Sequence, residues 1–297
     1  MNPSTPNIVC FGEILWDLLP SGKIAGGAPM NVAFHANQLG VNAQMISKVG
    51  RDELGQQLID LLSQKGVDTS LVQTDDNYPT GTVNVTFDTI GSPSYEIIAP
   101  VAWDFIYANA INKAAVQSAD AFIFGSLAAR NETTRNALFE LLQLAKLKIF
   151  DVNLRSPFYT KELLMDLLDQ VDIVKMNDEE LEIISEWLDI VDTEEKKALH
   201  VKNHFDCQQL IITRGAKGAW LIKNNKMIKT QGVPIQVQDT IGSGDSFLAA
   251  FLSKLLKKES PQKCLKFAAA TGAYVATKKG GTPQLSEAQI NELIKNK

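Results

Sequence analysis

The feature of this sequence best suited to chemistry is a glycine turn that leads into an apolar helix. The turn reads Asp239-Thr240-Ile241-Gly242-Ser243-Gly244-Asp245. Two glycines one residue apart predict backbone angles that other residues resist. The residues that follow have a helical period, with one apolar face made by Phe247, Leu248, Phe251, Leu252, Leu255 and Leu256. We therefore expect an anion site at the start of a helix, formed by the backbone amides of Gly242, Ser243 and Gly244.

A carboxylate, Asp245, stands in the first turn of the same predicted helix. An anion site beside a carboxylate suits phosphoryl transfer to a hydroxyl, because the amides can hold the phosphate while the carboxylate takes the proton. The structural alternative is that Asp245 only complements the helix dipole. A serine hydrolase is disfavoured because the G-x-S-x-G spacing around Ser243 is missing, and no Walker A motif occurs.

This turn closely resembles the D-T-x-G-A-G-D signature of the PfkB (ribokinase-like) family of sugar kinases, with Ser243 where alanine is usual. The family's N-terminal glycine motif is matched by Gly26-Gly27-Ala28-Pro29-Met30-Asn31-Val32-Ala33. The matches run from about Gly12 to Pro283. The resemblance implies a ribokinase-like three-layer α/β/α fold with a mainly parallel central sheet and a small β-sheet lid. It also implies an ATP-dependent sugar kinase in which Asp245 is the general base.

Composition agrees with a globular enzyme. The 297 residues are 45% hydrophobic and 21% charged, and the net charge of −5 argues against nucleic-acid and membrane-surface partners. Three cysteines, odd in number and far apart, predict no disulfide framework and a reducing, cytoplasmic location. The first residues do not resemble a signal peptide, and no apolar stretch approaches the length of a membrane span.

Most of the chain alternates between strand and helix patterns, which predicts a parallel sheet covered on both faces. The expected strands are residues 8–12, 44–49, 121–124, 148–152, 172–176, 209–213 and 219–222. The expected helices are residues 30–39, 54–65, 132–144, 161–168 and 179–205, the last in two pieces, besides the helix after Asp245. Ligands bind outside the carboxyl ends of such strands, where Asp151, Asn177 and Thr213 fall.

A different pattern marks the segment that the family uses as a lid. Residues 82–87 alternate with period two, and with residues 95–98 beyond a Gly91-Ser92-Pro93 turn they predict a small antiparallel sheet. We expect one domain over residues 1–297, with a lid from about 13–26 and 79–101. Because a thin lid should not bury the apolar face of 82–87 alone, we expect the lids of two subunits to pack as a homodimer.

The resemblance assigns the sugar-binding residues. Asp17 matches the lid aspartate that binds sugar hydroxyls, and Gly26, Gly27 and Asn31 match the motif that closes around the sugar. Asp151-Val152-Asn153-Leu154-Arg155 resembles the D-x-N-x-R motif of fructokinase-like members. We expect Asp151, Asn153 and Arg155 on one side of an extended chain, with Arg155 helping to neutralise the phosphoryl group. A structural salt bridge is the alternative.

Nucleotide and metal contacts are assigned in the same way. Asn177 to Glu180 resembles the N-x-x-E motif that organises Mg²⁺ through water, although a helix capping box explains the same residues. Thr213, Gly215 and Gly218 resemble the family's nucleotide turn, which joins Asn177, Gly242 and Gly244 at ATP. A K⁺ site is implied at backbone carbonyls of Asp239, Ile241, Lys278 and Gly280. His200 and His204 have a zinc-compatible spacing but no acidic or thiol neighbour.

The glycine motif also indicates the substrate. The Gly-Gly-Ala-Pro-x-Asn form is typical of fructokinases, so D-fructose with MgATP is the first expectation. Ala28 and Pro29 stand where ribokinases carry a lysine. Within the enzyme class, 2-keto-3-deoxygluconate, ribose and nucleosides are the alternatives. Outside it, a non-catalytic sugar sensor on the same fold is the alternative, against which the intact Asp245 counts.

Overall fold

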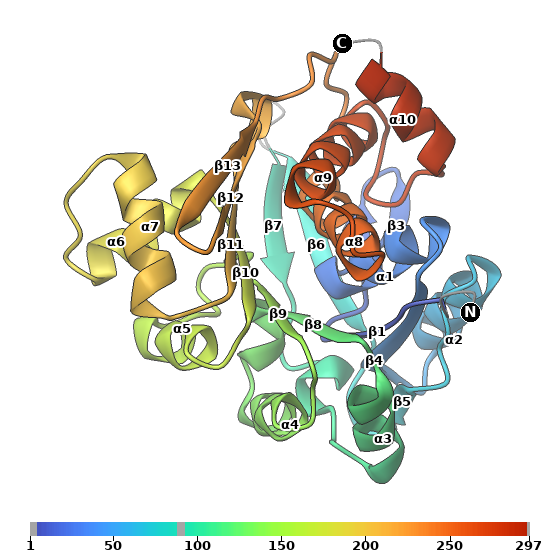
Figure 1. Ribbon diagram of the computed structural model, residues 1–297. Helices are drawn as coiled ribbons and strands as arrows, with labels where there is room; N and C mark the ends of the chain where they lie inside the picture. The colour runs from blue at the N-terminus through green and yellow to red at the C-terminus, as the bar shows by residue number, and fades with distance from the viewer. Residues whose placement is uncertain (1–4, 88–92, 296–297) are drawn as a thin grey trace.

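The computed structural model describes residues 5–87 and 93–295, and a nine-stranded sheet forms its centre (Figure 1). Its strand order is β13-β12-β11-β10-β9-β8-β1-β4-β5. All pairs from β11 to β5 are parallel, whereas β12 pairs antiparallel with both β11 and β13. The direction of strand addition reverses at β1, where β4 lies on one side and β8 on the other. Such a reversal opens a crevice at the carboxyl ends of the strands.

Most strands of the large sheet are buried and apolar, as expected of strands covered on both faces. The strands of this sheet are β1 (Asn7–Phe11), β4 (Asn42–Gly50), β5 (Val72–Asp75), β8 (Ala121–Gly125), β9 (Lys148–Asp151), β10 (Ile173–Asn177), β11 (Gln209–Thr213), β12 (Ala219–Lys223) and β13 (Lys226–Thr230). The analysis of the sequence missed β5 and β13. Both are edge strands, and β13 is only partly buried, so neither carries a strong apolar pattern.

Helices cover both faces of this sheet, which confirms the predicted layers. One face carries α1 (Ala28–Gln38), α2 (Glu53–Gln64), α8 (Ser243–Leu256), α9 (Pro261–Ala276) and α10 (Glu287–Lys295). The other carries α3 (Ala110–Ser118), α4 (Glu132–Leu142), α5 (Lys161–Leu168), α6 (Asp178–Trp187) and α7 (Glu194–His204). Short 3₁₀ turns lie at Ala102–Phe105, Ser126–Ala129 and Gly215–Lys217.

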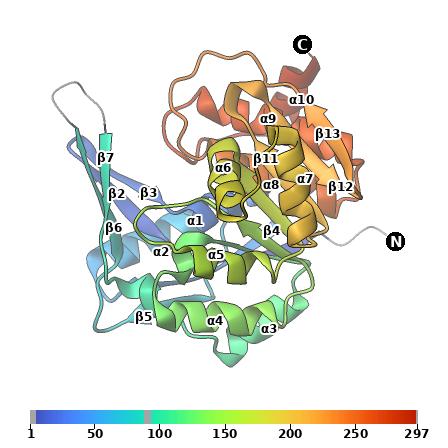
Figure 2. The same ribbon diagram turned by 90° about the vertical axis from the view of Figure 1, so that its left-hand side faces the viewer.

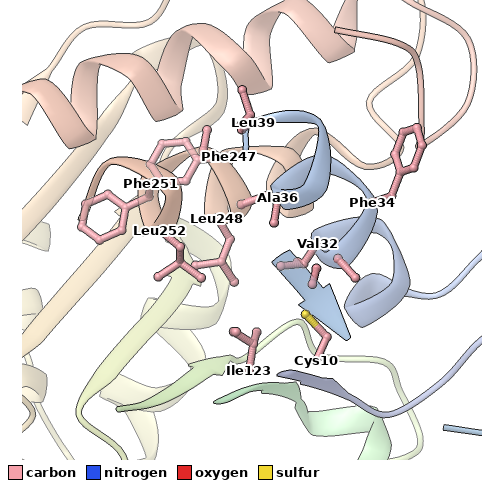
Figure 3. Packing of buried hydrophobic residues seen from close by; sticks show 14 of the residues in the cluster. Cys10, Val32, Phe34, Ala36, Leu39, Ile123, Phe247, Leu248, Phe251 and Leu252 are labelled. Atoms are coloured by element: carbon pink, nitrogen blue, oxygen red, sulfur yellow. The ribbon is translucent and has the colours of Figure 1, made fainter. Parts of the chain in front are cut away.

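The helix α8 lies in the middle of its layer, against α1, α9 and the sheet (Figure 3). Phe247, Leu248, Phe251 and Leu252 are at most 4% exposed. A helix buried on several sides is held rigidly. The turn at its start, which carries the predicted anion site, is therefore fixed relative to the strand ends.

A second, four-stranded sheet projects beside the large one (Figure 2). Its order is β3 (Gly22–Gly26), β2 (Leu15–Leu19), β6 (Gly81–Phe87) and β7 (Pro93–Ile97). The pairs β2–β3 and β6–β7 are antiparallel, whereas β2 and β6 run parallel. The two segments predicted to form the lid thus form one sheet. The predicted turn at Gly91-Ser92 lies outside the described residues.

One expectation about this sheet is wrong in its physical reason. Val83 and Val85 on β6 are only 6% and 5% exposed in a single chain, where they pack with Leu15, Leu19 and Ile97. Val83 and Val85, which form the described part of this face, therefore do not require a second subunit to bury them.

Candidate active site

The predicted polar residues meet at the carboxyl edge of the large sheet. Asp151 ends β9, Asn177 ends β10 and Thr213 ends β11, in neighbouring strands. The register pairs Asn177 with Thr213 and Asp151 with Lys175. The first turn of α8 reaches the same edge, because Gly244 lies against Lys175. Residues far apart in the chain are thus brought into one site.

The glycine turn begins α8, but its two glycines differ in purpose. Gly242 is the N-cap residue, with φ of 73° in the left-handed region, and a Cβ atom there would collide with the carbonyl of Gly281. Gly244 lies inside the helix, and its φ is not in the left-handed region. The expectation that both glycines serve unusual backbone angles is therefore wrong for Gly244. The hydroxyl of Ser243 donates to the Gly272 carbonyl at 3.0 Å, which ties the turn to α9.

Asp245 occupies the third position of α8 and is partly buried. Its Oδ2 accepts a hydrogen bond from Asn31 Nδ2 at 2.8 Å. Burial and the nearby negative charge of Asp151 raise the pKa of Asp245 to about 6, although Asn31 and two cations oppose them. A carboxylate with a pKa near neutrality is suited to accept a proton and release it again. The Oδ1 atom of Asn31 is buried without a partner among the described residues, so it can accept from a ligand.

A buried lysine was missed by the sequence analysis. Lys175 on β10 is 6% exposed, and its Nζ donates to both oxygens of Asp151 at 2.7 and 2.8 Å. Burial opposes its charged form, but the charges of Asp151 and Glu180 outweigh burial and raise its pKa. The signal was present as a lysine within the apolar run Ile173-Val174-Lys175-Met176. A lysine is rarely fully buried unless it is paired.

Glu180 completes the acidic side of this cluster. Its Oε2 accepts from the backbone of Asn177 and its Oε1 from the backbone of Leu154, both at 2.8 Å. The side chain of Asn177 accepts from the Glu180 amide at 2.7 Å, so the predicted capping box is present. Burial raises the pKa of Glu180, and the charge of Asp151 adds to this effect. The positive charge of Lys175 opposes both effects and lowers the pKa of Glu180.

The segment after β9 does not have the predicted geometry. Asn153 has φ of 40°, in the left-handed region, so Asp151, Asn153 and Arg155 do not alternate along an extended chain. Asp151 turns inward to Lys175, and the Asn153 carbonyl accepts from Ser126 at 3.3 Å. Arg155 is exposed at the site, and its charge lowers the pKa of both Asp17 and Asp245. Arg155 therefore lies within electrostatic range of both Asp17 and Asp245.

The small sheet contributes Asp17 from β2. Burial raises its pKa to about 6. A Cβ atom on Gly26 would lie 2.7 Å from Oδ2 of Asp17, so Gly26 leaves room for this carboxylate. Gly27, with φ of 118°, lets the backbone of Glu13 pass close to the start of α1. Both glycines thus have structural reasons beyond the predicted approach to a sugar.

Glu13 is a second residue that sequence analysis missed. It is 3% exposed, its Oε1 accepts from the Ala28 amide at 3.2 Å, and its Oε2 has no partner among the described residues. Burial raises its pKa to about 7, while the charge of Arg155 lowers it. Glu13 follows Gly12 at the end of β1, so its place after a buried strand was the available signal.

The remaining predicted residues lie at the end of β11 and in the turn that follows it. Thr213 ends β11, and its hydroxyl is 3.4 Å from the Met176 carbonyl. Gly215 and Gly218 have φ of 51° and 96° and flank the short 3₁₀ turn after it. These glycines form a tight turn toward β12.

Asp239 joins two loops at the start of α8. Its Oδ1 accepts from the Ile241 amide at 3.0 Å and its Oδ2 from the Gly280 amide at 2.9 Å. The two segments predicted to share a K⁺ ion, around Ile241 and around Lys278 to Gly280, are therefore held together. The buried His35 supports the same loop, because its Nε2 lies 2.9 Å from the Gly281 carbonyl, and burial lowers its pKa to about 4.

No cluster of three or more histidine, cysteine, aspartate or glutamate side chains with metal-binding geometry occurs within residues 5–87 and 93–295. His200 and His204 thus lack the further ligands that a zinc site needs. No described helix is long and apolar enough to cross a membrane.

Known proteins resemble this chain in both fold and sequence. A fructokinase with bound ATP from Xylella fastidiosa superposes with a TM-score of 0.88 at 25% identity, over 98% of each chain. A sugar kinase from Pyrococcus horikoshii in complex with ATP has a TM-score of 0.83 and 31% identity, over 96% of this chain and 99% of that one. A probable fructokinase-3 from Arabidopsis thaliana is 31% identical over 94% of this chain and 88% of its own length.

The fold and the site therefore define an α/β phosphotransferase with a ribokinase-like arrangement of layers, as predicted. The model of the pfkB family carbohydrate kinases matches residues 20–288, and the chain belongs to this family. It is an ATP-dependent sugar kinase.

Proposed function

We propose that this kinase phosphorylates D-fructose with MgATP and that Asp245 is its general base. The observation that carries the mechanism is the position of Asp245. It lies at the start of α8, beside three backbone amides, is bonded to Asn31, and has a pKa raised to about 6. The fructokinase names of the relatives support fructose as the substrate.

In the proposed reaction, the sugar hydroxyl attacks the γ-phosphorus of ATP. The new oxygen–phosphorus bond forms while the bond to ADP breaks, and the electron pair leaves with ADP. Asp245 takes the hydroxyl proton. The amides of Gly242 and Gly244 face the transferred phosphoryl group, whereas the Ser243 amide donates to the Thr240 carbonyl at 3.2 Å. Arg155 and Lys175 supply positive charge beside the phosphoryl group. Asp17 and Oδ1 of Asn31 bind other sugar hydroxyls, with the four-stranded sheet as the lid.

The donors around Glu180 fit Mg²⁺ held through water. Both oxygens of Glu180 already accept a backbone hydrogen bond, which leaves further lone pairs for waters rather than a direct carboxylate cage. When bound, Mg²⁺ would neutralise phosphate charge. Asp151 is paired with Lys175. We therefore propose that Asp151 balances charge in the site rather than binding the sugar.

The nucleotide is proposed to lie along Asn177, Thr213, Gly215 and Gly218, on the side of α8 away from the small sheet. A K⁺ ion is proposed at the carbonyls of Asp239, Ile241, Lys278 and Gly280. The support is the bridge that Asp239 makes between those loops.

The test of the function is ADP release with a panel of acceptors under one set of conditions. We expect kcat/KM for D-fructose to exceed that for ribose, 2-keto-3-deoxygluconate and adenosine by at least about tenfold, because polar groups left unpaired by a wrong sugar are strongly penalised. A tenfold advantage for another acceptor refutes the choice of fructose. Absence of sugar-dependent ADP release with every acceptor would support the sensor alternative.

One observation favours 2-keto-3-deoxygluconate as the second candidate. The sequence showed no cation for an acidic sugar in the lid, but the structure brings Arg155 within electrostatic range of Asp17. An exposed guanidinium there can pair with a sugar carboxylate. Arg155→Met should then reduce turnover of the acidic sugar by a larger factor than turnover of fructose.

A homodimer through the small sheet and a cytoplasmic location also remain proposals. The exposed Ile24 and Tyr95, 43% and 53% exposed, are the remaining support for contact between the small sheets of two subunits. The three buried, unpaired cysteines Cys10, Cys207 and Cys264 support a reducing compartment. Light scattering at micromolar concentration tests the dimer, and a mass near 32.6 kDa would contradict it.

A further inference from the structure

A cavity of about 460 Å³ lies between the starts of α4 and α5 and the segment that leaves β7. Its described lining includes none of the residues placed in the proposed sugar or nucleotide site. Arg130, Asn131 and Arg135 give it polar walls, and Pro100, Phe158 and Leu163 give it apolar ones.

Arg130 lines this cavity, and one of its nitrogens has no hydrogen-bond partner among the described residues. The guanidinium lies between the rings of Trp103 and Phe158, at 3.8 and 4.8 Å from their centroids. Its Nε and Nη2 donate to Asp104 at 2.6 and 2.8 Å, and Nη2 also donates to the Ile98 carbonyl at 2.8 Å. The side chain is only 4% exposed, yet Nη1 has no partner among the described residues. A buried donor left unpaired costs about 1–3 kcal/mol, so it indicates a missing acceptor.

Arg135 adds a positive charge that the fold does not balance. It lies in the second turn of α4 and is partly buried, and its guanidinium forms no hydrogen bond or ion pair with the part of the chain that the structure describes. Asn131 caps the same helix, so the positive end of the α4 dipole faces the same region. Asp104, by contrast, is already neutralised by Arg130. The cavity therefore has an excess of donors and of positive charge.

We propose that this cavity is a binding site for a small phosphate monoester. Guanidinium groups and a helix N-terminus are the groups that recognise phosphate oxygens. The volume of about 460 Å³ far exceeds that of one phosphate group, since a water takes about 30 Å³. The walls at Pro100, Phe158 and Leu163 accommodate the carbon skeleton of the ester.

The ligand would connect two parts of the active site. Ala99 and Pro100 follow the last strand of the small sheet, and Pro157 to Thr160 follow Arg155 closely in sequence. A phosphate ester bound between them holds the small sheet to the loop of Arg155. Binding of the phosphate ester should therefore change the affinity of the active site for the sugar. The proposal for the phosphate site does not depend on which sugar the kinase uses.

The test is calorimetric titration with glucose 6-phosphate, with inorganic phosphate and glucose as separate probes. Saturating D-fructose and a non-hydrolysable ATP analogue are present to fill the catalytic cleft. We expect one glucose 6-phosphate per chain, weaker binding of inorganic phosphate, and no binding of glucose. Arg135→Met should weaken binding by about tenfold to a hundredfold, the value of a charge-assisted hydrogen bond.

Two further variants make the result decisive. Lys113→Met removes one positive charge from the neighbouring helix α3, where Lys113 pairs with Glu140, and should leave binding unchanged. Arg135→Lys keeps the charge but loses the planar fork, and should weaken binding by an intermediate factor. Absence of glucose 6-phosphate binding to the wild type, or equal affinity in the wild type and both Arg135 variants, overturns the proposal. If the wild type binds glucose 6-phosphate but shows no kinase activity, the proposed function is contradicted and the phosphate site is supported.

Discussion

The Nζ atom of Lys175 lies 3.3 Å from the position that a Cβ atom on Gly244 would occupy. Lys175 comes from β10 and Gly244 from the first turn of α8. The contact places a buried positive charge beside the backbone amides of the proposed anion site. Gly244 is therefore suited to its position because it leaves space for this ammonium group.

We expect Lys175→Met to lower kcat by about 10² to 10³, the effect of removing one electrostatic contact to a transition state. The affinity for fructose, measured by calorimetry, should change much less. Because the single variant leaves Asp151 buried and unpaired, it should also lose about 3–5 kcal/mol of stability.

The double variant Asp151→Asn/Lys175→Met separates these two effects. It removes the whole ion pair, so thermal unfolding should return toward that of the wild type while kcat stays low. If kcat recovers together with stability, Lys175 has only a structural role.

The two glycines of the turn should respond differently to alanine. Gly242→Ala combines φ of 73° with a collision at the Gly281 carbonyl, so it should destabilise the protein and reduce turnover severely. Gly244→Ala needs only a small movement of the flexible end of Lys175, so it should fold normally and lose less activity. Thermal melts and steady-state kinetics of both variants test this order. Equal damage in both would show that Gly244 is needed for its backbone conformation.

Asp245→Asn should lower kcat by about 10² to 10⁴, the usual contribution of a general base, with sugar binding retained. In the wild type, kcat/KM should fall as the pH drops through about 6, because the protonated carboxyl cannot accept the hydroxyl proton. The raised pKa also means that ionised Asp245 destabilises the fold above that pH. Asp245→Asn should therefore melt at a higher temperature than the wild type at pH 8, and a variant within a few-fold of wild-type turnover would refute the assignment.

The local patterns explain why the fold could be predicted well from the sequence. Apolar runs and terminal glycines mark where strands and helices begin and end along the sequence. In the same way, the glycine turn before Phe247 indicated the start of α8. Lys175, Glu13 and His35 were missed because their importance depends on what other segments bring beside them. Lys175 acquires its role from Asp151 and Gly244, which are remote in the chain.

The geometry of single residues was also beyond the sequence. The D-x-N-x-R spacing fits an extended chain, and only the left-handed angle at Asn153 breaks the alternation. Similarly, the alternation of residues 82–87 revealed an apolar face but not that Leu15, Leu19 and Ile97 cover it within the same chain. Both errors come from reading a local pattern without its tertiary neighbours.

Glu13 predicts a pH dependence of stability that is separate from catalysis. Burial raises its pKa from an ordinary 4.5 to about 7, so the protonated form is the one that the fold favours. Its contribution to stability is fully present below about pH 4.5 and is lost as the pH rises through about 7.

The amide oxygen of Glu13→Gln can still accept from the Ala28 amide, without the charge. The melting temperature of Glu13→Gln relative to the wild type should therefore rise between pH 5 and pH 8.5. Glu292→Gln, on an exposed position of α10, is the matched control and should show no such trend. A pH-independent difference for Glu13→Gln would mean that Glu13 is ionised in the folded protein throughout this range.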